Sequence, residues 1–398
     1  MTGHLTKRQS GFSLLEMTVA VALGSVVLAA AVAMYTQGVS ASFTVTQRAE
    51  MQEDFRAASN MLTKDLGLAG AGLGNGAAIQ LVSGGSTPQY GCDQTNTCYI
   101  NGVAGTYPLQ GGNPFMYGLI TGYNLGPTLN ATQGPTDVIT VIYTDQNFYL
   151  NCYNAKVTSK GFVTFSEPTP WPPAGCIPNG VAAPQAVNDT AAGLTKGDLV
   201  FMTLNNIQIV AEVTGAVTTG TDGNGNPTYT VPFANTGGTT DPLKMNQTPN
   251  GGGLNSAPVN ATGNNEPAPC QAPASCRLMA VTYYIDKTTT PARLMRMVSG
   301  HTPMPVVENI AWMKFSYDLY NDSTGTPAIN QPNPGSGDAQ DTASNGLLPN
   351  QITKINILNM AMNSTVMGTM FAQDMYQRMD LQTSVCARNL TYNNNYPN

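Results

Sequence analysis

The feature that most constrains this chain is a long apolar stretch close to its N-terminus, from Phe12 to Met34, in which Glu16 is the only charged residue. A helix needs about 20 predominantly apolar residues to cross a bilayer, so this stretch is long enough to span one. Lys7 and Arg8 precede it, and basic residues favour the cytoplasmic side of a membrane. We therefore expect one membrane-spanning helix that leads into an exported domain.

A cleavable secretory signal is the alternative interpretation of this stretch. Its apolar core is longer than the usual length of roughly 7–15 residues. No small-x-small cleavage site clearly ends it, although the alanine-rich tract around Ala29–Ala33 imitates one. A carboxylate inside a membrane segment is costly and is by default functional, with a positive group as its partner. We expect Glu16 to meet such a group on a neighbouring chain; a carboxylate hydrated at the membrane interface is the plainer alternative.

The segment from Lys7 to Met17, with the sequence KRQSGFSLLEM, resembles the prepilin leader of type IV pilins and type II secretion pseudopilins. Basic residues, glycine, phenylalanine, glutamate and apolar tract all follow in the family's order. The resemblance implies that a membrane peptidase cuts between Gly11 and Phe12 and N-methylates Phe12. It also implies that Glu16 pairs with the N-terminal amine of an adjacent subunit.

We expect the helix to continue beyond the membrane as an amphipathic segment. An apolar row recurs there at helical spacing: Met51, Phe55, Ala58, Leu62 and Leu66. The row predicts packing on a globular head, and it is too short for a sustained coiled coil. The glycines from Gly67 to Gly74 are expected to end the helix. The expected division is a leader (1–11), a transmembrane half of the helix (12–35), an amphipathic half (36–70) and an extracytoplasmic β-rich head (71–398).

The head is expected to be a loop-rich antiparallel β structure, which makes the whole chain a pilin-like α+β protein. Among 398 residues there are 41 Gly and 27 Pro, and only 10% are charged, which is typical of β proteins with an uncharged polar surface. Runs rich in β-branched residues predict strands at Asp137–Tyr143, Asp198–Leu204, Ile207–Val213, Leu278–Ile285, Ala311–Tyr317, Ile352–Leu358 and Leu381–Ala387. Loops are expected over about 214–276, 321–350 and much of 84–135, and no second-domain boundary is evident.

Scattered segments of the head resemble the PilW family of minor pilins, which is related to the J-type pseudopilins. They occur in the family's order: MLTKDL at 61–66, KGDLV at 196–200, VVENI at 306–310, FSYD at 315–318, YQR at 376–378 and TSVCARN at 383–389. The long loops depart from a compact member of that family.

Seven cysteines are present: Cys92, Cys98, Cys152, Cys176, Cys270, Cys276 and Cys386. The first six form couples that are close in sequence (92/98, 152/176 and 270/276), which in an exported protein favours short disulfide-closed loops. Zinc is the alternative, but structural zinc sites prefer Cys-x2-4-Cys spacing, whereas two of these couples are Cys-x5-Cys. Cys386 is left over, as a free thiol or as half of an intermolecular bridge.

Few residues offer catalytic or metal chemistry. Only two histidines exist, and cleavage of the leader would leave His301 alone, which we interpret as a surface turn residue. No Gly-x-Ser-x-Gly motif is present. The segment from Asp222 begins like a calcium loop but has Phe233 in place of the bidentate glutamate, so a hairpin turn is expected. Calcium binding in the loops around Asp318 and Asp338 stays open. We otherwise expect no enzyme activity, no cofactor and no metal.

The resemblance implies a minor pilin subunit that takes part in type IV pilus assembly or its initiation. Its partners would be other pilins and minor pilins, the prepilin peptidase and the inner-membrane assembly platform. The prepilin would lie in the bacterial inner membrane with its head in the periplasm before entering the filament. The formal charge of −6 without a basic cluster beyond the leader argues against nucleic acid as a partner. A pseudopilin, a pilus-associated adhesin and an anchored enzyme are the alternatives.

Overall fold

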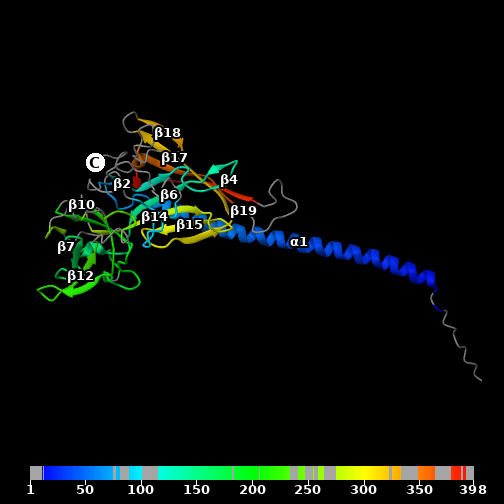
Figure 1. The fold of residues 1–398 in the computed structure, drawn as a ribbon, viewed down its shortest axis with the longest axis horizontal. Coiled ribbons are helices and arrows are strands. Elements are labelled where there is room, and N and C mark those ends of the chain that lie inside the picture. The colour runs from blue at the N-terminus through cyan, green and yellow to red at the C-terminus, as the bar shows by residue number, and fades with distance from the viewer. Residues whose placement is uncertain are drawn as a thin grey trace, which may run out of the picture.

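The chain has an α+β fold in which one long N-terminal helix precedes a head of antiparallel sheets (Figure 1). The computed structural model describes residues 11, 13–74, 78–80, 89–100, 115–181, 183–205, 207–233, 241–246, 254, 259–263, 275–321, 325–332, 348–363, 378–386 and 389–390. The expected fold class is confirmed.

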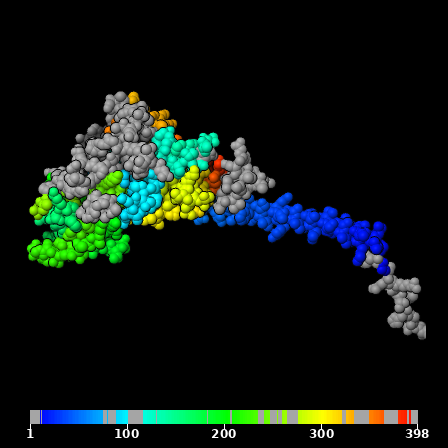
Figure 2. Space-filling model, viewed as in Figure 1, coloured from blue at the N-terminus to red at the C-terminus, as the bar shows by residue number. Residues whose placement is uncertain are grey.

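Helix α1 (Leu14–Gly67) contains 54 residues, so it is about 80 Å long at 1.5 Å per residue. Its first half projects away from the head as a free rod (Figure 2), and its C-terminal turns pack into the head. The predicted apolar row is buried: Met51, Phe55, Ala58, Leu62 and Leu66. Burial begins at Met51 and not near residue 36, because the head does not reach the preceding turns; Val39, Phe43 and Val45 are exposed there.

The largest sheet has seven strands and is organised around β14 (Cys276–Asp286). One edge of β14 pairs with β6, while the opposite edge pairs with β15 and, nearer Cys276, with β9. The outer strands β3, β16 and β10 extend it beyond β6, β15 and β9. Their bounds are β3 (Leu119–Gly122), β6 (Val138–Thr144), β9 (Leu199–Leu204), β10 (Ile207–Glu212), β15 (Arg293–Val298) and β16 (Met304–Glu308).

A second sheet has four strands in the order β18-β17-β19-β20. Their bounds are β17 (Ile310–Asn321), β18 (Thr326–Gln331), β19 (Ile352–Asn363) and β20 (Arg378–Cys386). Residues from this sheet, from the seven-stranded sheet and from the end of α1 share one apolar core. In β20 the odd-numbered side chains are half-buried while Gln382, Ser384 and Cys386 are exposed, as the strand period predicts.

A third sheet, here called the distal sheet, has five strands in the order β11-β12-β8-β7-β13. Their bounds are β7 (Asn154–Ser159), β8 (Phe162–Ser166), β11 (Thr218–Thr221), β12 (Pro227–Pro232) and β13 (Thr262–Gly263). Its inner side packs in an apolar core with residues of β9 and β10, separate from the core that holds α1. In Figure 1 this sheet lies at the end of the molecule opposite the N-terminal half of α1.

Short elements complete the described fold. Strand β1 (Ala78–Gln80) pairs with β2 (Phe115–Tyr117), and β4 (Thr128–Asn130) pairs with β5 (Gly134–Pro135). Two 3-10 turns are formed by Leu150–Cys152 and Pro349–Gln351.

All seven predicted strands are present, with ends shifted by a few residues. The loop predictions are wrong in part. The expected loop at 214–276 contains β11, β12 and β13, that at 321–350 contains β18, and that at 84–135 contains β2 to β5. The Gly, Pro and Asn of these strands locally favour turns, whereas their tertiary surroundings favour strands.

Candidate assembly site: helix α1 and its seat in the head

The N-terminus of α1 is closed by a reciprocal capping box. Ser13 is the N-cap, and its hydroxyl oxygen accepts a hydrogen bond from the backbone N–H of Glu16 at 3.2 Å. In return the Glu16 carboxylate accepts from the backbone N–H of Ser13 at 3.0 Å and from its hydroxyl at 3.1 Å. Our sequence analysis missed this cap, although Ser-x-x-Glu before an apolar run is its signature.

The cap places the carboxylate of Glu16 in the first helical turn, beside the positive end of the helix dipole. Gly11 lies just upstream, while Phe12 and the preceding leader lie outside the described residues. The one acidic group of the apolar half is thus held at its very beginning, next to the peptide bond that the resemblance marks for cleavage.

Within the described part of the chain, α1 is the one helix that is long and apolar enough to cross a membrane. The most apolar part of this helix has no residue buried inside the molecule. Leu23, Leu28 and Met34, for example, are each at least 60% exposed, at 63%, 69% and 75%. Such a surface requires lipid or other apolar helices around it, since soluble monomers rarely expose large continuous apolar patches.

At its other end α1 carries a buried charge, Asp65, with 4% of its surface exposed. Its carboxylate accepts hydrogen bonds from the Tyr283 hydroxyl of β14 at 2.7 Å and from Arg296 Nε of β15 at 2.8 Å. Burial alone would lower the pKa of Arg296, but the hydrogen bond and charge of Asp65 raise it above its usual value. Burial, followed by the charge of Asp65, raises the pKa of neighbouring Tyr143 to about 12.

This triad, here called the Asp65 anchor, joins the helix to two neighbouring strands of the seven-stranded sheet. Because a buried carboxylate is stable only with its partners, the anchor favours one rotation and one depth of α1 in the head. The sequence pattern did not reveal the anchor. Asp65 directly precedes Leu66, the last residue of the apolar row, and a polar residue at that position is expected to face solvent.

Directly after α1, the backbone at Gly70 and Ala71 packs closely against the backbone of β6 and of Gly118. The Gly70 N–H donates to the carbonyl of Ile142 at 2.9 Å, and Thr144 N–H donates to the carbonyl of Ala71 at 2.9 Å. A Cβ at Gly118 would lie 2.5 Å from the Gly70 Cα, so a side chain there would displace the exit. These contacts attach the end of α1 to β6, and the anchor attaches it to β14 and β15.

The cysteines form local covalent loops. The structure joins Cys92 to Cys98 and Cys152 to Cys176, as their spacing suggested. Cys276 is also disulfide-bonded, while its predicted partner Cys270 lies outside the described residues. Cys386 is a free, exposed thiol at the end of β20.

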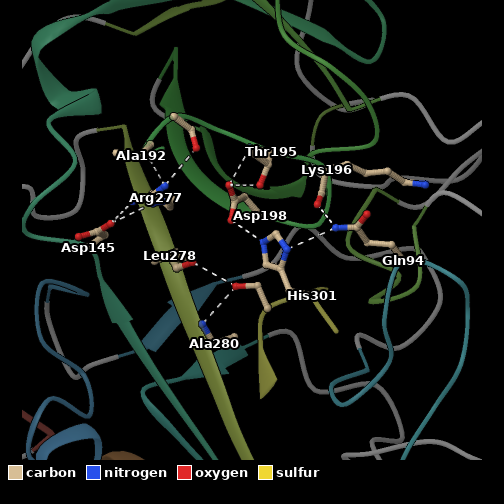
Figure 3. A network of polar contacts seen from close by, with 12 residues as sticks. Gln94, Asp145, Ala192, Thr195, Lys196, Asp198, Arg277, Leu278, Ala280 and His301 are labelled. Carbon is tan, nitrogen blue, oxygen red and sulfur yellow. Dashed lines mark hydrogen bonds and ion pairs between the residues drawn. The ribbon is translucent and has the colours of Figure 1, made fainter. Parts of the chain in front are cut away.

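A polar network joins residues of the seven-stranded sheet to the Cys92–Cys98 loop and to the segment 189–198 that precedes β9 (Figure 3). His301 Nε2 lies 2.8 Å from Asp198 Oδ1, and its Nδ1 lies 3.4 Å from the Gln94 amide in the Cys92–Cys98 loop. On the neighbouring stretch of β14, Arg277 pairs with Asp145 and donates to the carbonyl of Ala192 at 2.9 Å. The interpretation of His301 as a surface turn residue is therefore incomplete, because its side chain is two-thirds covered and bridges three segments.

Two of the carboxylates considered for calcium, Asp222 and Asp318, have protein partners. Asp222 closes the β11–β12 hairpin by accepting the N–H groups of Asn224 and Asn226, each at 2.8 Å. Asp318 pairs with Lys354 at 2.9 Å. Asp338 lies outside the described residues. Among the residues that are described, no group of three or more His, Cys, Asp or Glu side chains is placed to hold a metal ion.

Comparison with family models identifies the start of the chain. Residues 6–32 match the prokaryotic N-terminal methylation motif. The match covers the end of the leader, Gly11, Phe12, Glu16 and most of the apolar half of α1. The motif, together with the exposed apolar helix that it overlaps and the antiparallel head, indicates a type IV pilin-like or pseudopilin protein. No match is found among curated proteins or among solved structures.

Proposed function

We propose that this chain is a minor pilin subunit of a type IV pilus, which enters the filament through α1 and takes part in starting its assembly. The observation that carries the proposal is the fully exposed apolar half of α1, most of which lies within a methylation motif. The prepilin is anchored in the inner membrane with its head in the periplasm. It is cleaved between Gly11 and Phe12, and Phe12 is N-methylated.

Two physical effects drive assembly in this proposal. Apolar contacts between neighbouring helices replace lipid around the rod when the subunit leaves the bilayer. Glu16 sets the register, because a carboxylate buried in the filament without a positive partner is far less stable than a paired one. The partners are other pilins and minor pilins, the peptidase and the assembly platform of the inner membrane.

The narrower assignment to PilW-like minor pilins rests on the order of the resembling segments and on where they lie. The segment 61–66 forms the last turns of α1, 196–200 leads into β9, and 306–310 joins β16 to β17. These are the segments that seat the helix and start core strands. We also propose that the chain is not an enzyme, since the cleaved form retains a single histidine, which is engaged by Asp198.

Processing is tested by intact mass and N-terminal sequencing of the protein from native membranes, with and without the prepilin peptidase. The expected product starts at N-methylated Phe12 and forms only when the peptidase is present. A chain that keeps its leader, or one cut near Ala31–Ala33, would refute the filament assignment.

The role of Glu16 is tested with two substitutions that separate its charge from its cap. Glu16→Ala removes both, whereas Glu16→Gln retains a side chain that completes a capping box with Ser13 but carries no charge. We expect both variants to insert into the membrane and neither to enter filaments, measured by immunoblotting of sheared filaments against the membrane fraction. Normal incorporation of the glutamine variant would show that capping alone suffices and would sink the register argument.

A type II secretion pseudopilin is the second candidate, because the same motif introduces both kinds of subunit. Deletion of the gene distinguishes them. Loss of surface pili with secretion intact supports the pilus, and accumulation of secreted enzymes in the periplasm with pili intact supports the secretion system.

A further inference from the structure

The outward side of the distal sheet presents an ordered row of small polar side chains. Strand register aligns one residue from each of the five strands: Thr218, Thr230, Thr164, Lys156 and Thr262. The residues that alternate with them, such as Val157, Phe165 and Val231, are buried in the core below. We call this outward side the threonine face.

The hydroxyls of this face are joined to one another. Thr164 Oγ1 lies 2.8 Å from Thr230 Oγ1 and 3.3 Å from Thr158 Oγ1, which connects β7, β8 and β12. The next row along the strands adds Thr228, Ser166 and Asn154. With strands about 4.8 Å apart, the row is about 19 Å wide, so the face offers a regular array of donors and acceptors on a rigid support.

The charge of the face is opposite to that of the protein. The chain has a net charge of −6, yet none of the five strands contains Asp or Glu. Lys156 lies in the row, and Lys160 lies at the adjoining β7–β8 turn; both are exposed. Within the described residues neither ammonium forms an ion pair, whereas Lys314 and Lys354 pair with aspartates. The face therefore holds two unneutralised positive charges among hydroxyls.

We propose that the threonine face binds an acidic polysaccharide, a polymer whose sugars carry carboxylates. The hydroxyl rows can form hydrogen bonds with the hydroxyls of the sugar rings, and Lys156 and Lys160 can form ion pairs with the carboxylates. Two lysines without a set of exposed aromatic platforms are a poor match for nucleic acid, which needs more phosphate contacts or stacked bases. The face lies at the end of the molecule away from the membrane half of α1 (Figure 1), where a filament subunit meets its surroundings.

The test uses the full chain in lipid nanodiscs and measures binding of alginate, a polymer of uronic acids, by calorimetry. Dextran serves as the neutral polysaccharide, and a single-stranded oligonucleotide as the other polyanion. We expect alginate to bind in a salt-dependent manner and the other two to bind at least tenfold more weakly. Lys156→Glu should weaken alginate binding about tenfold, since it removes the ion pair between the lysine and a carboxylate of the polymer and adds a repulsion between two carboxylates. Lys287→Glu, the same charge change in the turn after β14, should leave it within about twofold.

Thr164→Val tests the hydroxyl row separately. Valine is favourable in strands, so the sheet should persist, and thermal unfolding checks this. The variant should bind alginate several-fold more weakly with the same salt dependence. The proposal is overturned by absent alginate binding in the unmodified chain, by equal binding of dextran or the oligonucleotide, or by equal effects of the Lys156 and Lys287 substitutions. None of these results depends on filament assembly, so they are separate from the tests of the proposed function.

Discussion

The Asp65 anchor gives the sharpest prediction about how the helix is held. In Asp65→Ala the guanidinium of Arg296, whose side chain is 25% exposed, loses its only acidic partner among the described residues. The Tyr283 hydroxyl, completely buried, loses its acceptor at the same time. Removing one partner of a buried ion pair costs about 3–5 kcal/mol, because the remaining charge stays buried without compensation. We therefore expect the free energy of unfolding of the head to fall by about 3–5 kcal/mol.

Urea unfolding of the full chain in detergent, followed by tryptophan fluorescence, measures this change. With a slope of about 3 kcal/mol per molar urea, the midpoint should fall by about 1–1.7 M. The control is Glu308→Ala, which breaks the exposed pair between Arg293 and Glu308 and should cost at most about 1 kcal/mol. If Asp65→Ala costs no more than this control, the anchor does not hold the helix. The double variant Asp65→Ala with Arg296→Met should recover part of the loss, because it also removes the orphaned charge.

Two further predictions concern a buried acid and a disulfide of the head. Burial, followed by the nearby charge of Asp241, raises the pKa of Glu212 well above its ordinary value of 4.5. A carboxyl group whose pKa is raised by folding contributes less to the stability of the folded protein as the pH rises above its ordinary pKa. We therefore expect thermal stability to fall between about pH 5 and pH 8, and Glu212→Gln to flatten this fall. An unchanged pH profile in the variant would contradict this. Replacing Cys152 and Cys176 together by alanine opens a disulfide across 24 residues and should lower stability by about 3 kcal/mol in oxidised protein. A reductant should then lower the unfolding midpoint of the variant less than that of the unmodified chain, because only the other disulfides remain to be reduced.

The helix and its buried row were predictable because the signals are local. Side chains three and four residues apart share a helical face whatever surrounds the helix, so Met51, Phe55 and Leu62 mark the buried side directly. Seven strands of the two sheets around α1 were predictable for a similar reason, since runs such as Leu278–Ile285 are rich in β-branched and aromatic residues. The others, β3, β15, β16 and β18, were not predicted. Two of the three predicted disulfide couples, Cys92–Cys98 and Cys152–Cys176, followed from short spacing.

The distal sheet was not predictable from composition. Three of its strands, β11, β12 and β13, contain Gly or Pro, which locally favour turns. The sheet forms because Val163, Phe165 and Val231 share a core with residues of β9 and β10. That core depends on contacts between segments far apart in the sequence. A strand's preference follows from such packing more than from its own residues.

The sequence by itself determined the N-terminal helix of this protein: an apolar rod with one acid at its start, a methylation motif that covers most of that rod, and a periodic apolar row behind it. These properties depend on neighbours within a few turns of one helix, so no other part of the chain can change them. Only the tertiary structure decided that Asp65 meets Arg296 and Tyr283, more than 200 residues away, and that threonines from four strands align in one row with a lysine from the fifth. Such contacts arise when distant segments pack together, and a linear pattern carries no record of which segments will do so.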